Sequence, residues 1–174
     1  LRGFDAVYLG AVGYPGVPDH ISLGGLLLRI RRGFDEYINL RPIRLLKGAP
    51  CPLADVRPED VNMIVVRENS EGEYANVGAR LYSDTEREVA FQTAVFSRHG
   101  CERVIRYAFE LARHEKRSLT SISKGNALRY SMVFWDEVFA EIGQEYPDVE
   151  THSLLVDAAS MFFVKDPKRF EIVV

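Results

Sequence analysis

The sequence predicts an α/β fold, and two observations support this prediction. Segments with the apolar patterns of strands and helices alternate over the last two thirds of the chain, as they do in proteins built on a mostly parallel sheet. Three short apolar stretches also end directly on a charged residue: Val61–Val66 before Arg67, Ser118–Ser123 before Lys124, and Ser153–Val156 before Asp157. Because ligands of open α/β sheets bind outside the carboxyl ends of the strands, we expect these three charged side chains to share one crevice.

Composition and charge narrow the class of protein. The 174 residues are 47% hydrophobic, which is enough for one large domain or parts of two. The net charge of -3 gives no field that would attract nucleic acid or an anionic membrane, so neither is predicted as a partner. Cys51 and Cys101 are far apart and have no metal-type spacing, which predicts reduced thiols in a cytoplasmic protein.

The two ends of the sequence predict that it is an internal segment of a longer protein. It opens on Leu1 without an initiating methionine and closes on Phe170–Val174, an apparent strand with no turn after it. A natural domain rarely ends inside a buried strand, because the chain beyond normally continues to the surface.

The first element expected is a short buried strand at Asp5–Leu9, followed by a loop rich in glycine and proline, Gly10–Gly16. The loop lacks the G-x-G-x-x-G spacing of a dinucleotide-binding loop, and Pro15 and Pro18 stand where a helix should begin. We therefore favour a strand-to-loop turn over a phosphate-binding loop.

A helix is predicted next, from a cap at Ser22 to about Ile38. Its apolar residues follow the helical period and form one face, which is typical of an amphipathic helix. Arg31 adjoins this face, and Arg41 follows the helix just before Pro42, which disfavours helical geometry in the residue before it. A proline-rich connection, residues 44–58, then leads to the strand before Arg67.

The segments Ala79–Ser83 and Glu88–Ser97 are predicted to form a hairpin around Asp84–Arg87. The second strand carries apolar residues on both sides, and this pattern indicates burial on both faces. Either the hairpin packs within its own domain or a second subunit covers it, and the sequence favours neither.

The remaining helices follow from apolar periodicity and capping residues. They are expected at Gly100–His114, from a cap at Asn126 to Pro147, and around Ala158–Val164. Asp166 and Pro167 are predicted to begin one more helical turn before the final strand.

Several cations could bind an anionic ligand. Arginine binds a carboxylate through two hydrogen bonds, so Arg31, Arg41 and Arg67 would suit a small dicarboxylate if they converge; the alternative for each is an ordinary surface arginine. Lys124, between a strand and a helix, could act as a general base if it is partly desolvated. Its alternatives are an anion anchor or an exposed turn lysine.

Two further residues could serve the same site. Asp157 offers a hard oxygen of the kind that Mg²⁺ and Mn²⁺ prefer, but one carboxylate is not a metal site. Tyr74 could donate a proton from the end of its polar loop, although a loop tyrosine more often packs.

Four groups of residues carry a resemblance to a known family: Arg31 with Asn39–Pro42, Val66–Asn69 with Tyr74, Lys124–Asn126, and Val156–Asp157. Their order and spacing resemble the metal-dependent decarboxylating dehydrogenases of isopropylmalate, isocitrate, and tartrate or D-malate. The resemblance implies the mixed sheet flanked by helices of the isocitrate/isopropylmalate dehydrogenases. It also implies that residues 1–37 are part of the nucleotide-side domain and residues 38–174 a dimerising domain, with a hairpin arm near 79–97.

The segment Pro18–Leu23, followed by Leu26–Leu28, is most similar to the tartrate dehydrogenase/decarboxylase branch, whose members also oxidise D-malate. Gly25 stands about where the isocitrate enzymes have a serine, which argues against isocitrate. The resemblance thus implies an NAD-linked dehydrogenase of tartrate or D-malate that decarboxylates the 2-oxo acid. The alternatives are an isopropylmalate- or isocitrate-type dehydrogenase and a non-catalytic subunit of the same fold.

The resemblance also implies a role for each candidate residue. Arg31, Arg41 and Arg67 would hold the carboxylates of the substrate. Lys124, as the base, and Asp157, as a metal ligand, would act in the site of the neighbouring subunit of a homodimer. Tyr74 would protonate the enolate, and Asn126 would lie near the nicotinamide ribose. The implied cofactors are NAD and Mn²⁺ or Mg²⁺, and a monovalent cation is compatible with them.

Two features depart from the family pattern. Ser123 stands where many relatives carry an aspartate before the lysine, so the orientation of Lys124 is expected to differ. The other metal-binding aspartates and the adenine-binding loop of the family are expected after Val174, and its first strands before Leu1.

Overall fold

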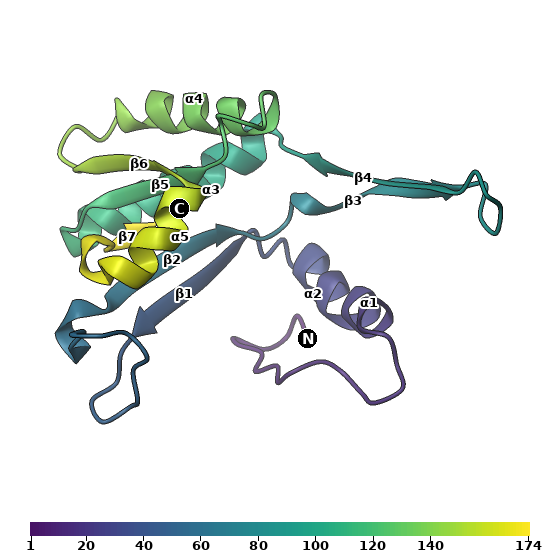
Figure 1. The fold of residues 1–174 in the computed structure, drawn as a ribbon, viewed down its shortest axis with the longest axis horizontal. Helices are drawn as coiled ribbons and strands as arrows, with labels where there is room; N and C mark the ends of the chain where they lie inside the picture. The colour runs from purple at the N-terminus through teal and green to yellow at the C-terminus, as the bar shows by residue number, and fades with distance from the viewer. The chain divides into compact units, whose positions relative to one another are not determined.

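The computed structural model describes all residues, 1–174. The chain divides into two compact units, Leu1–Glu36 and Tyr37–Val174, and each is described by itself (Figure 1). No helix is both long enough and apolar enough to span a membrane. The domain roles implied by the resemblance stay predictions.

In the first unit, the prediction of a strand at Asp5–Leu9 is wrong, because the chain has no helix or strand before Asp19. A strand needs a hydrogen-bonded neighbour, and neither sheet contains a strand that pairs with these residues. Tyr8 is fully exposed, so this segment is not buried within the chain.

The expected helix is present with different ends. It runs through α1 (Asp19–Ser22), a π-helical turn η1 (Leu23–Leu27) and α2 (Leu28–Gly33). Pro18 precedes its first residue, so Ser22 is not the cap; instead the Ser22 hydroxyl donates to the carbonyl of Asp19 at 3.2 Å. The helix ends at Gly33 and not at Ile38, because Asp35 takes a left-handed conformation (φ 50°) that reverses the chain.

The second unit contains a five-stranded mixed sheet in the order β1-β2-β7-β5-β6 (Figure 1). The strands are β1 (Ile38–Arg44), β2 (Asn62–Glu68), β5 (Leu119–Ser123), β6 (Thr151–Leu155) and β7 (Ile172–Val173). β1 pairs antiparallel with β2, and the other neighbours are parallel. The α/β mixed sheet flanked by helices is therefore confirmed, and the final strand lies at its centre.

Strand β1 was missed by the sequence analysis, which ended a helix near its start. It holds Arg41 and Pro42 in register with Val65 and Ile64 of β2. Proline is tolerated because β1 is an edge strand, where a missing N–H removes no bond on the solvent side. The short turns η2 (Pro58–Asp60) and η3 (Pro167–Arg169) complete the connections.

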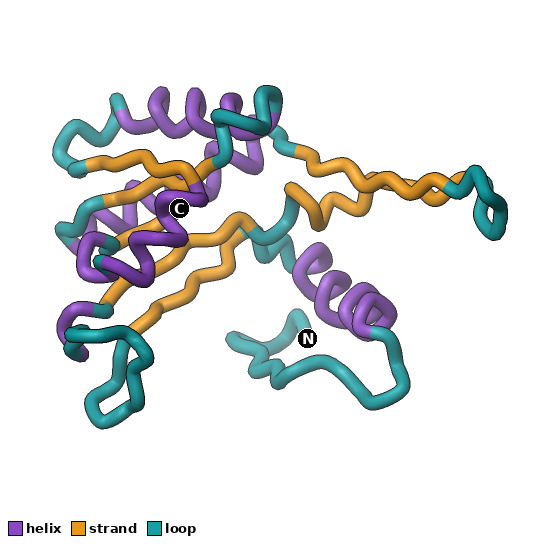
Figure 2. Tube along the Cα trace, viewed as in Figure 1, coloured by secondary structure: helices purple, strands orange, loops and turns teal.

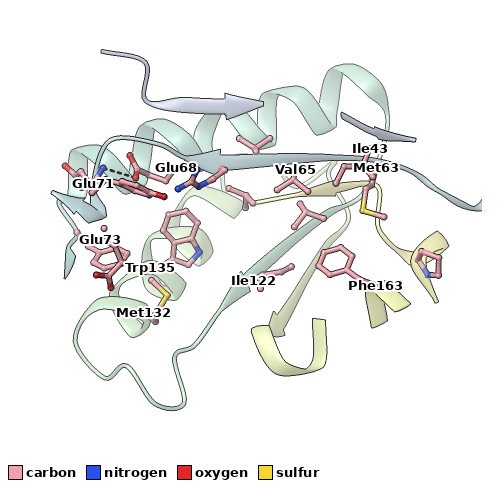
Figure 3. A pocket seen from close by; sticks show the side chains of 18 of the residues that line it. Ile43, Met63, Val65, Glu68, Glu71, Glu73, Ile122, Met132, Trp135 and Phe163 are labelled. Atoms are coloured by element: carbon pink, nitrogen blue, oxygen red, sulfur yellow. Dashed lines mark hydrogen bonds between the residues drawn. The ribbon is translucent and has the colours of Figure 1, made fainter. Parts of the chain in front are cut away.

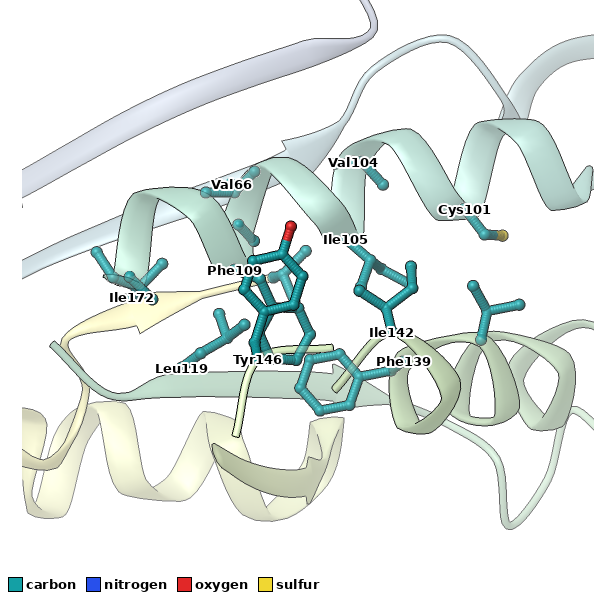
Figure 4. Close-up of a cluster of buried hydrophobic side chains, with 14 of the residues drawn as sticks. Val66, Cys101, Val104, Ile105, Phe109, Leu119, Phe139, Ile142, Tyr146 and Ile172 are labelled. Carbon is teal, nitrogen blue, oxygen red and sulfur yellow. The ribbon is translucent and has the colours of Figure 1, made fainter. Parts of the chain in front are cut away.

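Helices cover both faces of the sheet. The predicted helix α3 (Arg98–Glu115) and the later α4 (Ser131–Gly143) pack on one face, and α5 (Val156–Lys165) packs on the other. In the larger core, Phe109 of α3 contacts the rings of Phe139 and Tyr146 at 5.1 and 4.9 Å between centroids (Figure 4). Both cysteines are free, and burial raises the pKa of the Cys101 thiol to about 11.

Helix α4 begins later than predicted, and Asn126 is not its cap. Residues 125–127 form a turn instead. The carbonyl of Lys124 closes this turn by accepting the backbone N–H of Ala127 at 3.0 Å and of Leu128 at 2.9 Å. Because this turn uses the residues after Lys124, the first helical residue is Ser131.

The predicted hairpin is confirmed, with a first strand that begins earlier and a second strand that is shorter than expected. β3 (Gly72–Leu81) and β4 (Val89–Val95) form a separate two-stranded sheet that extends away from the five-stranded sheet (Figures 1 and 2). Val89 and Phe91 each remain 49% exposed. Its own chain therefore does not cover the apolar residues of the hairpin.

Candidate functional site

The carboxyl ends of the parallel strands β2, β7, β5 and β6 lie at one edge of the sheet. The three charged residues picked out by strand-end position are all at this edge. Arg67 is the second-last residue of β2, Lys124 directly follows β5, and Asp157 lies in the first turn of α5, just after β6. Arg67 thus belongs to the end of its strand and not to the loop after it.

Arg67 and Tyr74 form the first of two pairs at this edge. The guanidinium carbon of Arg67 lies 4.9 Å from the centroid of the Tyr74 ring, within the range of a cation–π interaction. Tyr74 is near the start of β3. The hairpin base and the end of β2 therefore bring a cation and a phenol together.

Arg41 lies on the same face of the sheet as Arg67. Arg67 is directly opposite Asn39 in the antiparallel register, and Arg41 is two residues further along β1, so the three side chains point to one face. The Arg41 Nε donates to Asn39 Oδ1 at 3.0 Å. Two guanidinium groups thus share this face, with an amide beside them.

Lys124 and Asp157 form the second pair. The Lys124 Nζ donates to Asp157 Oδ2, and this hydrogen bond, with the charge of the ammonium, holds the pKa of the Asp157 carboxyl below its usual value. The Asp157 side chain is 67% exposed and that of Lys124 32%. Both groups can therefore be reached from outside the protomer.

The two pairs come from strands that are not neighbours in the sheet. β7 lies between β2 and β5. Val173 of β7 pairs with Val65 of β2 and with Thr120 of β5, so Arg67 and Lys124 also lie at different levels along the sheet. Arg31 belongs to the other unit, in the last turn of α2, and Asn126 is exposed in the turn after Lys124. The roles of all seven candidate site residues, Arg31 and Asn126 included, stay predictions.

A pocket of about 710 Å³ opens beside the first pair. Arg67 and Tyr74 line it together with the glutamates of the polar loop, and most of its remaining lining is apolar. Figure 3 shows Glu68, Glu71 and Glu73 at one end, and Ile43, Met63 and Phe163 at the other. The charged end is the part that could hold a small polar substrate.

The polar loop before Tyr74 is fixed by a network that the sequence analysis missed. The Glu71 carboxylate accepts the backbone N–H of Ser97 at 2.8 Å and its hydroxyl at 2.6 Å. The Ser97 hydroxyl also accepts the N–H of Gly100 at 2.9 Å, as the N-cap of α3. Because Glu71 precedes β3 and Ser97 follows β4, these bonds clamp the base of the hairpin. The sequence did hold one sign of this network: Ser97, a residue type that often caps helices, stands directly before the apolar pattern of α3.

A neighbouring carboxylate shapes the same loop. Glu68 accepts the backbone N–H of Ser70 at 2.8 Å and of Glu71 at 2.9 Å. Arg103 of α3 donates to the Ser70 hydroxyl at 2.9 Å. Arg67 and Tyr74 therefore flank a loop that is hydrogen-bonded to itself and to a core helix.

The donor groups of this chain fit a divalent metal only in part. Asp157 supplies an accessible hard oxygen, as Mg²⁺ or Mn²⁺ requires. No group of three or more histidine, cysteine, aspartate or glutamate side chains in the chain could hold an ion. A metal at Asp157 would need further oxygen ligands beside this carboxylate.

Comparison with known proteins identifies relatives over the whole chain. The family model "Isocitrate/isopropylmalate dehydrogenase" matches residues 1–174. The chain is 51% identical over 176 residues to D-malate dehydrogenase [decarboxylating] of Escherichia coli, covering 100% of this chain and 49% of that protein. It is also 51% identical over 175 residues to 3-isopropylmalate dehydrogenase of Thermobifida fusca, with the same coverage. Identity to tartrate dehydrogenase/decarboxylase of Pseudomonas putida is 44%, over 100% of this chain and 48% of that protein.

The solved structures agree with the sequence relatives. Isocitrate dehydrogenase from Methylococcus capsulatus superposes with a TM-score of 0.79 at 35% identity, over 93% of this chain and 45% of that one. The chain spans about half the length of the curated relatives it matches. The resemblance drawn from the arginine, lysine and aspartate motifs is confirmed, and the chain belongs to the isocitrate/isopropylmalate dehydrogenase family.

Proposed function

We propose that the whole protein is a metal-dependent, NAD-linked dehydrogenase of D-malate or tartrate that decarboxylates the resulting 2-oxo acid. The observation that carries the proposal is the placement of two functional pairs, Arg67–Tyr74 and Lys124–Asp157, at the carboxyl edge of one sheet. Relatives named D-malate dehydrogenase and tartrate dehydrogenase support the choice of substrate. Two free cysteines are compatible with the proposed cytoplasmic location.

The arginines would bind the substrate. Arg41 and Arg67 share one face of the sheet, and a guanidinium can bind a carboxylate through two parallel hydrogen bonds. Arg31, from the other unit, would supply a further cation. A dicarboxylate held in this way has its hydroxyl carbon in a fixed position. Binding then supplies the orientation that the reaction needs, which lowers the entropic part of the barrier.

Lys124 and Tyr74 would move the protons. The Lys124 amine, after giving up the proton that it donates to Asp157, would take the proton of the substrate hydroxyl. NAD⁺, when bound, would accept the hydride from the carbon that carries this hydroxyl. After the C–C bond to the departing CO₂ breaks, the Tyr74 hydroxyl gives its proton to the carbon of the enolate. Asn126 would hydrogen-bond the nicotinamide ribose. Asp157 would hold Mn²⁺ or Mg²⁺, which polarises the carbonyl oxygen as a Lewis acid; a monovalent cation could add to the charge balance.

A homodimer would complete each site. The family resemblance implies that a second copy offers its Lys124 and Asp157 to this copy's Arg67 and Tyr74. The strand order is compatible with this arrangement, because β7 lies between the strands that carry the two pairs in one chain. The β3–β4 hairpin would be the arm between the copies, because its apolar residues are uncovered on the protomer. A symmetric pair of chains has two such shared sites.

3-Isopropylmalate is the second candidate substrate, because the relative named for it is as similar as the one named for D-malate. 3-Isopropylmalate carries an alkyl group that D-malate lacks. Each methylene of such a group changes the free energy by which an enzyme discriminates between two substrates by only about 1–3 kcal/mol. Their enzymes can therefore share most of their sequence.

Steady-state assays of the full-length protein test the proposal. NADH production would be measured with Mn²⁺ and NAD⁺ for five acids: D-malate, each of the two enantiomers of tartrate, 3-isopropylmalate and isocitrate. The highest kcat/KM is expected for D-malate or tartrate. A higher value for 3-isopropylmalate would replace the substrate, and no NADH from any of the acids would favour a non-catalytic subunit.

A further inference from the structure

The backbone on each side of Lys124 is held by one buried serine. Ser123, the last residue of β5, is only 6% exposed. Side chains alternate along a strand, so Ser123 points to the face covered by α4 while Lys124 points toward Asp157 and α5. The position of Lys124 therefore depends on what Ser123 contacts on the opposite face.

Asp136 of α4 is that contact. The Ser123 hydroxyl donates to Asp136 Oδ2 at 3.0 Å and accepts the backbone N–H of Gly125 at 3.3 Å. One carboxylate thus orients a hydroxyl that also bonds the residue after Lys124. The hydrogen bonds fix the chain before and after the lysine without touching the lysine itself.

The sequence next to Lys124 is adapted to this carboxylate. A Cβ atom on Gly125 would lie 2.4 Å from Asp136 Oδ2, far inside van der Waals contact. A larger residue here would displace the Asp136 carboxylate, so glycine allows the close approach of the backbone to this side chain. The distance shows that Asp136 packs directly against the turn that carries Lys124.

Helix α4 is a rigid support for this contact. The neighbouring residue Trp135 is buried and donates from Nε1 to the Ser121 hydroxyl at 3.1 Å. Trp135 and Asp136 therefore bond Ser121 and Ser123, two residues of β5 that face the same way. Two side-chain hydrogen bonds set the register of α4 on the end of β5.

We propose that Asp136 is a positioning residue for Lys124, acting through Ser123 and the Gly125 N–H. The inference rests on the proposed role of Lys124 as the base. Without the carboxylate, the turn 123–127 loses the anchor on its α4 side, and the amine no longer reaches the substrate hydroxyl in a single geometry. Binding of the substrate by the arginines is unaffected, so the loss falls on kcat and not on KM.

The first test compares variants of the full-length protein in the steady-state assay. D136A and S123A remove the same hydrogen bond from opposite ends, and each is expected to lower kcat by about 10- to 100-fold with KM for the acid nearly unchanged. D136N keeps an acceptor oxygen for Ser123 and is expected to restore most of kcat. E137A is the matched control, because it removes a carboxylate from the next, exposed residue of α4; its kcat is expected to equal that of the wild type.

Amide hydrogen exchange of the same proteins gives a readout that needs no turnover. D136A and S123A are expected to speed exchange in residues 123–128, whereas D136N and E137A leave it unchanged. An active wild type with kcat and exchange both unaltered in D136A, or a D136N as impaired as D136A, would overturn the inference and leave the proposed function intact. An inactive wild type with faster exchange in D136A would overturn the proposed function and leave the positioning of Lys124 standing.

Discussion

The larger core and the β3–β4 hairpin have similarly apolar sequences but opposite environments. In the core, Val104, Ile105, Ala108 and Phe109 of α3 are fully buried between the sheet and α4 (Figure 4). On the hairpin, Val89 and Phe91 are about half exposed. The core stabilises the protomer, whereas the hairpin presents apolar surface that the protomer does not use.

This difference indicates that folding and association depend on separate regions. Burial of apolar surface provides most of the free energy of folding, and the core already supplies that burial in one chain. An isolated two-stranded hairpin is at best marginally stable in water. In the proposed homodimer, the hairpin would gain its burial from a second copy.

The largest expected effect is on the core side of the comparison. F109A removes a fully buried ring and is expected to lower the free energy of unfolding by about 3–5 kcal/mol. Denaturant unfolding of the full-length protein measures this loss, and its dimeric state at moderate concentration should persist. A loss below about 1 kcal/mol would contradict the role assigned to the core.

On the hairpin side, F91D should act on association. A charge placed in a buried apolar interface is expected to raise the dimer dissociation constant by about 30-fold or more, with loss of activity at concentrations where the dimer dissociates. Sedimentation equilibrium measures the constant. E86K, at the exposed tip of the hairpin, changes charge without removing apolar surface and is the control. An unchanged constant in F91D would exclude the hairpin as the contact.

The junction between the two regions gives a smaller effect. E71Q weakens the charged hydrogen bonds to Ser97 that clamp the hairpin base and is expected to lower the free energy of unfolding by about 1–2 kcal/mol. KM for the acid should rise as well, because Arg67 and Tyr74 flank this loop. E137Q, on an exposed glutamate of α4 that does not line the pocket, is the control, and equal behaviour of the two variants would rule out the clamp.

The smallest effect concerns pH and the ion pairs that α3 makes with α4 and with the loop after it. Arg98 lowers the pKa of Glu141, Arg106 that of Glu145, and Arg113 that of Asp148. A carboxyl whose pKa is lower in the folded state stabilises the fold above its unfolded pKa, and this contribution is lost as pH falls through the folded pKa.

For Glu145, the contribution is therefore present above its ordinary pKa of 4.5 and is lost below it. R106Q should flatten the decrease in unfolding free energy as pH falls below this value, measured by urea unfolding at several pH values. The change should be small because the pair is on the surface. R129Q, on an exposed arginine outside these pairs, should keep the wild-type slope; equal slopes for both variants would argue against the assignment.

The local hydrophobic pattern of the sequence correctly predicted those elements that can be recognised from their own residues alone. The period of α3 and the alternation of β4 lie within single segments, and both were found. β1 was missed because its strand character depends on pairing with β2, while Pro42 and the adjacent arginine suggested the end of a helix. The α4 start was misplaced because Asn126 is a good cap by type, but the Lys124 carbonyl closes a turn there.

The site residues could be predicted only where their place in the sequence, next to the end of a strand, determines their place in the fold. Arg67, Lys124 and Asp157 were found because each follows a strand, and parallel strands end at one edge. The Asp136–Ser123 and Glu71–Ser97 bonds join residues 13 and 26 positions apart. No local period encodes such contacts, because they depend on how helices pack against the ends of the sheet.

The central claim is that each site combines Tyr74 of one copy with Lys124 of the other, and complementation tests it most directly. Full-length K124A and Y74F would each be purified, found nearly inactive, and then mixed under conditions that exchange subunits. Half of the dimers should be mixed, each with one intact site, so activity should recover to about a quarter of the wild-type value. No recovery in verified mixed dimers would show that both residues act within one protomer, and would contradict the account.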